Sequence, residues 1–349
     1  MIRFWEDVFS YGVFLLGPVL MTFPTPFDKK LADLRNLVNQ QVAQALRKPE
    51  PISLYEPMRY TLDAGGKRLR PLLVLLACEA VGGKARSALD AAVAVELLHN
   101  FTLIHDDVMD QDDTRRGQPT VHRKWDINVA ILAGDGLVAL SYDYLLRTKY
   151  SPIDQLGRLF SQALLEVCEG QALDKEYETR DDVTISEYLF MIEKKTAALL
   201  ALCCELGGYI GGGSQKVVAK LQQFGYNLGI AFQVQDDLLD IMAEEEHLGK
   251  TWGSDIKHKK KTMLLILAQK YATPADRATI AKIIGQSEIS TDEILCMKTI
   301  FERTGTIEHT RQLSQQHFEQ ARSSLSAIES DERRFLLEQF LDAVLVRTY

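Results

Sequence analysis

The chain has 349 residues, of which 46% are hydrophobic and 25% charged, so its composition is that of a globular protein and excludes a disordered, collagenous or disulfide-knotted chain. It carries 48 Asp and Glu against 40 Lys and Arg, for a formal net charge of −8. Such a chain has no general attraction to nucleic acid, and we expect no nucleic-acid partner. An anionic ligand would have to be held by local basic groups or by metal.

The cysteines and the N-terminus indicate where the protein works. Five cysteines, an odd number without a CxxC pair, indicate reduced thiols and a cytoplasmic protein. The apolar stretch at residues 11–23 is interrupted by a Gly-Pro pair, is too short for a stable membrane span and lacks the basic start of a signal peptide. We interpret residues 1–24 as an extension outside the core, with a weak membrane-surface anchor as the alternative, and residues 25–349 as one domain.

Helical periodicity dominates the remaining sequence, and we find no convincing alternating strand. The pattern predicts helices over residues 28–46, 54–62, 71–81, 84–116, 128–147, 154–178, 184–207, 215–245, 260–271, 274–284, 291–304, 306–328 and 330–347. Glycines and prolines separate most of these segments, whereas 84–116 contains neither. We therefore predict an all-α fold, a single large helical bundle whose central helices are buried on most faces.

A first acidic cluster, DDxxD, lies within the longest predicted helix, at Asp106, Asp107 and Asp110. Asp106 and Asp110 are about 40° apart on a helical wheel, and His99 falls on the same face. Two carboxylates one turn apart repel each other, so the arrangement favours a divalent cation between them, and hard oxygen ligands suit Mg²⁺. For this cluster alone a solvated acidic helix end is an equal alternative. His105 with Asp106 could also be the HD pair of a metal phosphohydrolase, but we see no matching set of further ligands.

The same DDxxD spacing recurs on a second predicted helix, at Asp236, Asp237 and Asp240. Gln233 shares a face with Asp236 and Asp240, and flanking apolar residues show that this cluster also emerges from a core helix. Gly225 and Gly229, one turn apart, would let a neighbouring helix approach closely. Two such clusters are hard to attribute to chance. Facing each other across a bundle, they could hold several Mg²⁺ ions around a diphosphate.

Basic motifs alternate with the acidic clusters along the chain. They are GGKRLRP at 65–71, Arg115-Arg116 after the first cluster, Lys194-Lys195-Thr196, and the Lys-rich segment 248–262 after the second cluster. The double glycine of GGKRLRP would let the backbone approach a phosphate, and arginine offers bidentate hydrogen bonds. Taken singly, a basic helix cap or a solvated surface explains each motif equally well. Together they indicate that metals and cations share anionic substrates.

This set of motifs resembles the trans-isoprenyl diphosphate synthase family. GGKRLRP, DDxxD followed by RRG, the KT pair, FQxQDDLLD, and GKxxGxDI with KKT occur in the family's order, over about residues 28–349. The resemblance implies a type I isoprenoid synthase fold around a deep central cavity, and a homodimer. It also implies a Mg²⁺-dependent prenyltransferase that condenses an allylic diphosphate (dimethylallyl, geranyl or farnesyl) head-to-tail with isopentenyl diphosphate.

The resemblance also implies roles for individual residues. Three Mg²⁺ ions per active site, replaceable by Mn²⁺, would be held by Asp106, Asp107, Asp110, Asp236, Asp237 and Asp240. The allylic diphosphate would be bound by Arg115, Lys195, Thr196, Gln233, Lys250 and Lys260, and the isopentenyl diphosphate by Lys67, Arg70, His99 and Arg116. The residues implied for catalysis are Asp106, Asp110, Lys195, Asp236 and Arg115. The chain departs from the family pattern at Lys259, where we expect Asn before the KKT motif.

Bulk just upstream of the first DDxxD limits product length in this family. Phe101 lies five residues before Asp106, about 7–8 Å along a helix, and Thr102 lies four before. An ideal wheel places Phe101 about 140° from Asp106, so the spacing alone does not show that its ring faces the cavity. A single aromatic residue there is similar to the geranylgeranyl (C20) type. The alternatives are a farnesyl (C15) or longer product, and a core phenylalanine without influence on length.

Other proteins also use acidic motifs on helices. A class I terpene cyclase or a squalene/phytoene-type synthase is disfavoured by GGKRLRP, by RRG and by the DDLLD form of the second cluster. A non-catalytic regulatory subunit of a heteromeric prenyl synthase should have lost acidic motifs, and both are intact here.

Overall fold

A computed structural model describes residues 13–14, 21–22, 25–242 and 252–345, so most of the predicted extension 1–24 and Lys250 lie outside the described residues. The helices are α1 (Pro26–Ala45), α2 (Ile52–Asp63), α3 (Leu69–Ala80), α4 (Leu89–Asp110), α5 (Val121–Lys124), α6 (Ile127–Arg147), α7 (Ile153–Glu178), α8 (Ile185–Ile192), α9 (Ala198–Ile210), α10 (Gln215–Met242), α11 (Ser254–Lys257), α12 (Met263–Tyr271), α13 (Pro274–Ile284), α14 (Thr291–Arg303), α15 (Thr306–Ser324) and α16 (Asp331–Leu345). The predicted all-α fold is confirmed.

Two short antiparallel strand pairs, which the periodicity does not predict, accompany the helices. They are β1 (Val13–Phe14) with β2 (Met21–Thr22), and β3 (Thr114–Arg115) with β4 (Gln118–Pro119). The second pair shows that the predicted helix 84–116 is too long, since α4 ends at Asp110. Gln111 takes a left-handed conformation (φ 57°) and its N–H donates to the Asp107 carbonyl, a helix end that composition does not signal. Gly117, with φ 73°, then forms the turn of the hairpin.

Most helix boundaries agree with the sequence because local signals fix them. Thr25, Thr184 and Ser290 each form a capping box with an acidic residue three positions later, which satisfies free N–H groups at the starts of α1, α8 and α14. The segment predicted as one helix at 184–207 is α8 and α9 joined by a π-helical turn at Glu193–Ala197.

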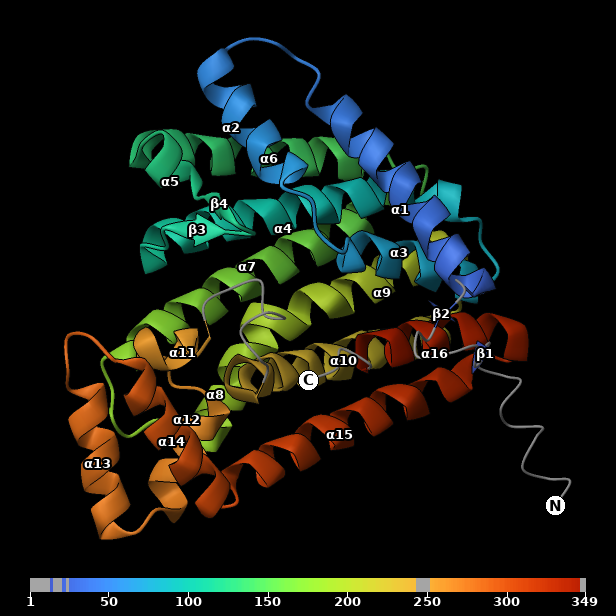
Figure 1. Cartoon of the computed structure of the whole chain (residues 1–349). Coiled ribbons are helices and arrows are strands. Elements are labelled where there is room, and N and C mark those ends of the chain that lie inside the picture. Colours follow the sequence, from blue (N-terminus) through green and yellow to red (C-terminus); the bar gives the residue numbers. More distant parts are fainter. Residues whose placement is uncertain (1–12, 15–20, 23–24, 243–251, 346–349) are drawn as a thin grey trace, which may run out of the picture.

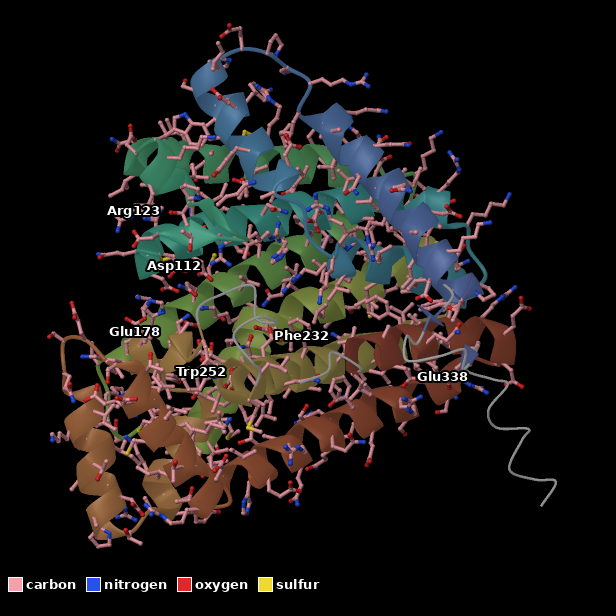
Figure 2. All side chains as sticks on the ribbon, viewed as in Figure 1. Asp112, Arg123, Glu178, Phe232, Trp252 and Glu338 are labelled. Atoms are coloured by element: carbon pink, nitrogen blue, oxygen red, sulfur yellow. The ribbon has the colours of Figure 1, made fainter. Side chains whose placement is uncertain are left out.

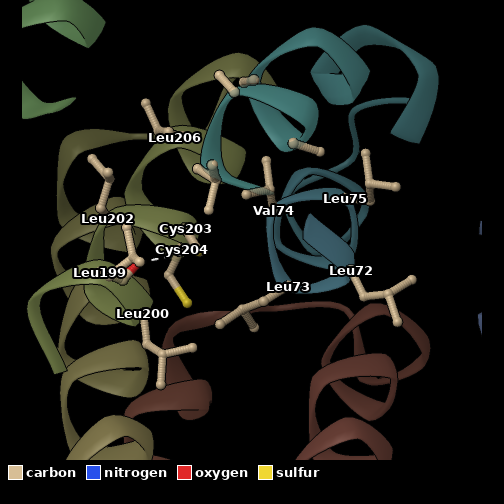
Figure 3. Close-up of a cluster of buried hydrophobic side chains, with 14 of the residues drawn as sticks. Leu72, Leu73, Val74, Leu75, Leu199, Leu200, Leu202, Cys203, Cys204 and Leu206 are labelled. Carbon is tan, nitrogen blue, oxygen red and sulfur yellow. Dashed lines mark hydrogen bonds between the residues drawn. The ribbon is translucent and has the colours of Figure 1, made fainter. Parts of the chain in front are cut away.

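The long helices run side by side across the molecule in stacked layers (Figure 1). Helix α4 packs against α6, α3 against α9, and α10 against both α9 and α15. Between α3 and α9 lies an apolar core in which Leu72, Leu73, Cys203 and Leu206 are wholly buried (Figure 3). At roughly 25 cal/mol per Å² of apolar surface, this burial is the main force that holds the layers together. It fixes the framework on which the polar residues of α4 and α10 are held.

Two helices are long and apolar enough to pass a length-and-composition test for a membrane span, Ala85–Asp110 and Ile127–Arg147, which is weak evidence by itself. In the first, 61% of the most apolar window is buried inside the protein, as in a core helix. All five cysteines are free, and three of them are buried, as the sequence indicates.

Gly225 and Gly229 allow close packing of α10 on the preceding helical segment, as predicted. A Cβ atom added at Gly225 would lie 2.4 Å from the Leu200 carbonyl oxygen, and one at Gly229 would lie 2.4 Å from the Ala197 Cα. Because both neighbours are backbone atoms, neither can move aside without shifting a helix. The helix that carries the second acidic cluster is therefore held against the helix that follows the KT pair.

We predict that Gly225→Ala lowers the free energy of unfolding by about 1–3 kcal/mol, because its methyl group would overpack this contact. Gly157→Ala in α7 is the matched control, since nothing lies within 4 Å of its added Cβ. That variant should be neutral or more stable by about 0.5–1 kcal/mol, the helix preference for Ala over Gly. Thermal and urea unfolding measure both, and equal effects would contradict the prediction.

Candidate active site

Two adjoining cavities open into the bundle between α4, α7 and α10. The larger has a volume of about 560 Å³ and the smaller about 220 Å³. The residues that line both cavities are Asp106, Arg115, Lys195, Thr196, Gln233 and Asp236. Figure 2 shows Asp112 and Glu178, at the ends of α4 and α7, at one end of the molecule, with Phe232 nearer its middle. Asp112 lines the smaller cavity and Phe232 the larger one, so charged residues lie toward the end and apolar ones deeper inside.

The first acidic cluster is held by lysines. The Lys195 Nζ lies 3.7 Å from Asp106 Oδ2, and Asp110 has Lys175 at 3.3 Å and Lys260 at 3.4 Å. Burial raises the pKa of Asp106 despite Lys195. At Asp110 burial also acts to raise the pKa, but the three lysines outweigh it and the pKa lies below its usual value. Repulsion between carboxylates one turn apart is thus offset by cations from three other parts of the chain.

Asp107 points away from the two cavities. Its side chain is 6% exposed, and Oδ1 accepts a hydrogen bond from the Arg115 Nε at 2.5 Å. Burial raises its pKa to about 6 although Arg115 opposes this. The β3–β4 hairpin that carries Arg115 is tied to α2 by the Tyr60 hydroxyl, which donates to the Pro119 carbonyl at 2.8 Å. Asp107 and the hairpin together fix a guanidinium group that lines both cavities.

The second acidic cluster divides in the same way. Asp236 lines both cavities. Asp237 lines the smaller one but is 3% exposed, and it accepts hydrogen bonds from the Tyr188 hydroxyl at 2.6 Å, the Gln233 Nε2 at 3.1 Å and the Met263 N–H at 3.3 Å. Burial raises the pKa of Asp237, and the nearby Asp255 adds to this. Its oxygens therefore join α8, α10 and α12.

Asp240 is fully buried and lines neither cavity. Its carboxylate accepts hydrogen bonds from the Ser254 hydroxyl and the Asp255 N–H. Three of the six predicted metal ligands, Asp106, Asp110 and Asp236, therefore face the cavities without such backbone or hydroxyl anchors. Among the described residues, no group of three or more acidic, histidine or cysteine side chains gathers closely enough to hold a metal ion by itself.

The KT pair lies on the π-helical turn between α8 and α9. Such turns insert one extra residue and often occur at functional sites. The Lys195 Nζ lies 2.5 Å from Asp174 Oδ2, and the Thr196 hydroxyl donates to the Gln233 Oε1 at 3.0 Å. A Cβ on Gly170 would lie 2.3 Å from the Lys195 backbone nitrogen, so glycine is needed where α7 crosses this turn. Lys194, one residue earlier, instead pairs with Glu169.

The residues of GGKRLRP separate in the structure. Arg68 turns inward, where it pairs with the buried Glu96 at 2.6 Å. Arg70 lines the larger cavity and donates to the His99 Nε2 at 3.1 Å, which makes that nitrogen an acceptor. Burial, with Arg70 and further arginines nearby, lowers the pKa of His99 well below its usual value, so the imidazole is neutral at pH 7. Lys67 is exposed and lines neither cavity.

Arg116 and the KKT motif complete the basic groups. The Arg116 guanidinium donates to the Gly65 carbonyl outside the two cavities. Lys260 lines the smaller cavity; burial acts to lower its pKa, but Asp255 and Asp110 outweigh this and raise it. Lys259 has φ 57°, a left-handed conformation that Asn tolerates better than Lys, which gives a physical reason for the Asn expected there.

Both residues predicted to limit chain length line the larger cavity. The Phe101 ring packs edge-on against His105, with ring centroids 4.7 Å apart. The Thr102 hydroxyl donates to the His99 carbonyl at 2.8 Å. The helical wheel left the orientation of Phe101 open because it describes one narrow face. The cavity is wide enough to include the Phe101–His105 face of α4 as well as the Thr102–Asp106 face.

Sequence reasoning missed four residues at this site, Gln171, Asp174, Lys175 and Asp255. The first three lie within one turn of α7, in a segment we treated as an ordinary core helix. Their signal was polar residues at helical spacing beside Gly170. Gln171 is 8% exposed, and neither its amide nitrogen nor its oxygen has a hydrogen-bond partner within the described structure, which marks a polar group facing the cavity.

Comparisons with known proteins give the family. The family model for polyprenyl synthetases matches residues 51–301. A geranylgeranyl diphosphate synthase from Methanosarcina mazei is 41% identical over 314 residues, which cover 89% of this chain and 95% of that protein. A geranylfarnesyl diphosphate synthase from Natronomonas pharaonis is 37% identical over 94% of this chain and 100% of its own. The crystal structure of geranylgeranyl pyrophosphate synthetase from Pyrococcus horikoshii aligns with a TM-score of 0.87 at 36% identity, over 93% of this chain and 100% of that one.

The fold and the paired acidic helices thus define an isoprenoid synthase, a helical prenyltransferase. The chain belongs to the polyprenyl synthetase family, as the sequence motifs indicate.

Lys195→Gln would remove the cation that lies between Asp106 and Asp174. We predict that Mg²⁺ alone then raises the melting temperature more than it does in the wild type, because the ion relieves repulsion that Lys195 otherwise relieves. Thermal unfolding with and without Mg²⁺ measures this. Lys194→Gln is the matched control, since Lys194 pairs with an exposed carboxylate at Glu169. Equal Mg²⁺ responses in Lys195→Gln and wild type would show the prediction to be wrong.

Proposed function

We propose that this protein is a geranylgeranyl diphosphate synthase, which extends allylic diphosphates with isopentenyl diphosphate to a C20 product. The observation that carries the proposal is the pair of adjoining cavities, one ringed by carboxylates and lysines and the other bounded by Phe101 below the first cluster. The names of the M. mazei and P. horikoshii relatives support the same product class. A charged compartment suits a diphosphate, and a mainly apolar one suits a growing prenyl chain.

The acidic residues fit the Mg²⁺ ions that the family implies. Asp106 and Asp110 present carboxylates one turn apart, and Asp236 lines the same cavity from α10. Mg²⁺ keeps several waters and takes its remaining ligands from substrate phosphates, so a few facing carboxylates are an adequate donor set. When bound, Mg²⁺ would neutralise negative charge on the leaving diphosphate. Asp107, Asp237 and Asp240 as ligands, the count of three ions and replacement by Mn²⁺ stay predictions.

The chain's own cations would hold the allylic diphosphate. Arg115, Lys195 and Lys260 line the smaller cavity and can each donate to diphosphate oxygens as the allylic C–O bond breaks. Lys250, outside the described residues, stays a predicted contributor. The Thr196 hydroxyl and the Gln233 amide, joined by a hydrogen bond, lie at the junction of the two cavities. Their oxygens are placed to face the positive charge that develops on the allylic carbon.

Isopentenyl diphosphate would bind beside Arg70 and His99. Arg70 lines the larger cavity, and a neutral His99 holds it through the Nε2 contact. The isopentenyl double bond attacks the allylic cation, and a proton then leaves to an oxygen of the departing diphosphate. The apolar walls keep water from the cation, which would otherwise give an alcohol. Lys67 and Arg116, which lie outside the two cavities, stay predictions for this substrate.

The protein would act in the cytoplasm as a homodimer. Exposed apolar side chains gather on α6 and α7, at Ile131, Leu132, Leu146 and Leu165. Such a face is unusual on a monomer and suits a second copy of this chain. This pairing would also account for α6 being apolar enough to pass the test for a membrane span.

A different chain length is the main alternative. The N. pharaonis relative is named a geranylfarnesyl diphosphate synthase, so similar chains include one with a longer product in its name. Farnesyl diphosphate is the shorter alternative. A non-catalytic regulatory subunit is disfavoured because Asp106, Asp110 and Asp236 all line the cavities.

The proposal is tested by incubating the purified protein with Mg²⁺, isopentenyl diphosphate and each of the C5, C10 and C15 allylic diphosphates, and reading products by mass. We expect C20 from every primer. Asp106→Asn should lower kcat by about a hundredfold or more, since it removes charge from the ring of ligands. Asp143→Asn, at an exposed aspartate of α6 paired with Arg147, is the control and should leave the rate unchanged. The absence of any Mg²⁺-dependent product would overturn the proposal.

Phe101→Ala should lengthen the product beyond C20, because it removes an aromatic ring from the wall of the larger cavity. The product distribution from farnesyl diphosphate, read by mass, measures this. Phe335→Ala is the control, since Phe335 is 55% exposed on α16 and lines neither cavity. An unchanged chain length in Phe101→Ala would assign the limit to another residue.

A further inference from the structure

We propose that Asp240, the last aspartate of the second cluster, is a positioning residue that fixes residues 253–260 against α10. The motif resemblance implies instead that Asp240 binds metal. The inference rests on the proposed function, because the segment that Asp240 fixes brings Asp255 and Lys260 to the diphosphate cavity. It concerns how that part of the site is built, and its test includes a measurement that needs no activity.

The surroundings of Asp240 are those of an anchor. Its side chain is 0% exposed and lines neither cavity, although Asp236, one turn earlier on the same helix, lines both. Oδ1 accepts a hydrogen bond from the Ser254 hydroxyl at 2.9 Å, and Oδ2 accepts one from the Asp255 N–H at 3.0 Å. Each carboxylate oxygen therefore has a donor from the same short segment. A direct metal bond would have to displace one of these donors.

The backbone adds a third link between the same two parts of the chain. The Gly253 N–H donates to the Asp240 carbonyl oxygen at 3.0 Å. Gly253 has φ 66°, and a Cβ there would lie 2.7 Å from the Ile294 Cγ2, so the turn requires glycine. The chain thus returns onto α10 at one point, where three consecutive residues are fixed by a single aspartate.

The anchored segment carries groups of the smaller cavity. Asp255 belongs to α11 and its side chain lines that cavity. The Lys260 N–H donates to the Asp255 carbonyl at 2.9 Å, and the Lys260 Nζ lies 3.4 Å from Asp110 on α4. A buried carboxylate on α10 thereby sets the position of a lysine that reaches the first acidic cluster. Asp240 acts on the site through these residues and not by touching the substrate.

The two roles respond differently to an isosteric change. Asparagine can keep both links, because its Oδ1 can accept from the Asp255 N–H and its Nδ2 can donate to the Ser254 oxygen. It loses the negative charge that a metal ligand supplies. Alanine loses both links. An anchor should therefore be rescued by Asn, whereas a ligand should not.

Steady-state kinetics with the full-length protein test this difference. We expect kcat/KM of Asp240→Asn within about threefold of wild type, and that of Asp240→Ala lower by about tenfold or more through a raised KM for the allylic diphosphate, as loss of two buried hydrogen bonds implies. Asp236→Asn is the matched comparison, a cavity-facing aspartate on the same helix, and should lose activity as fully as Asp236→Ala. An Asp240→Asn as inactive as Asp236→Asn would overturn the proposal.

Hydrogen exchange of residues 252–262 without substrates tests the anchor independently of catalysis. Exchange should be faster by about tenfold or more in Asp240→Ala and close to wild type in Asp240→Asn. Ser254→Ala, which removes one link, replaces Asp240→Ala where that variant does not fold, and should give an intermediate increase. Unchanged exchange in the alanine variants would overturn the anchor. A wild-type protein without prenyltransferase activity but with these exchange rates would overturn only the proposed function.

Discussion

Carboxylates that repel one another have to be held around one cavity inside a helical bundle. Two unit charges 4 Å apart interact by about 4 kcal/mol at an effective dielectric constant of 20, which is comparable to the whole stability of many domains. In this chain Lys175, Lys195 and Lys260 approach Asp106 and Asp110 within 4 Å, from three different parts of the sequence. These lysines lower the repulsion, and the positions of α7, of the π-helical turn and of the segment after α10 follow from this need.

The remaining aspartates serve the same requirement by another route. Asp107 holds Arg115, and Asp237 joins Tyr188 to the start of α12. In each acidic cluster, then, some carboxylates face the cavity while others face the protein. A motif of five residues on a helix spans more than one face, so its members cannot all point to one ligand. This division lets one short motif both bind and build.

Much of the fold and of the site could be predicted from the sequence, since apolar periodicity and capping residues are local signals. The hairpin at 114–119 could not, because helix α4 ends at Gln111 through a left-handed residue with no Gly or Pro. The orientation of Asp240 depends on Ser254, in a four-residue helix too short to show a period. The role of Asp174 depends on which face of α7 meets Lys195 in the folded protein. Tertiary partners, which no local pattern contains, decide these features.

The π-helical turn at Glu193–Ala197 has a consequence for how this site tolerates change. It adds one residue to an otherwise continuous helix, so removal of any single residue there would restore a regular helix. Everything after the deletion would then rotate by about 100° relative to what precedes it. Tyr188 lies before the turn and faces Asp237, while Leu199 lies after it and lines the larger cavity. The catalytic half and the chain-binding half of this helix are thus kept in phase by residue number, a property that substitutions preserve and deletions abolish.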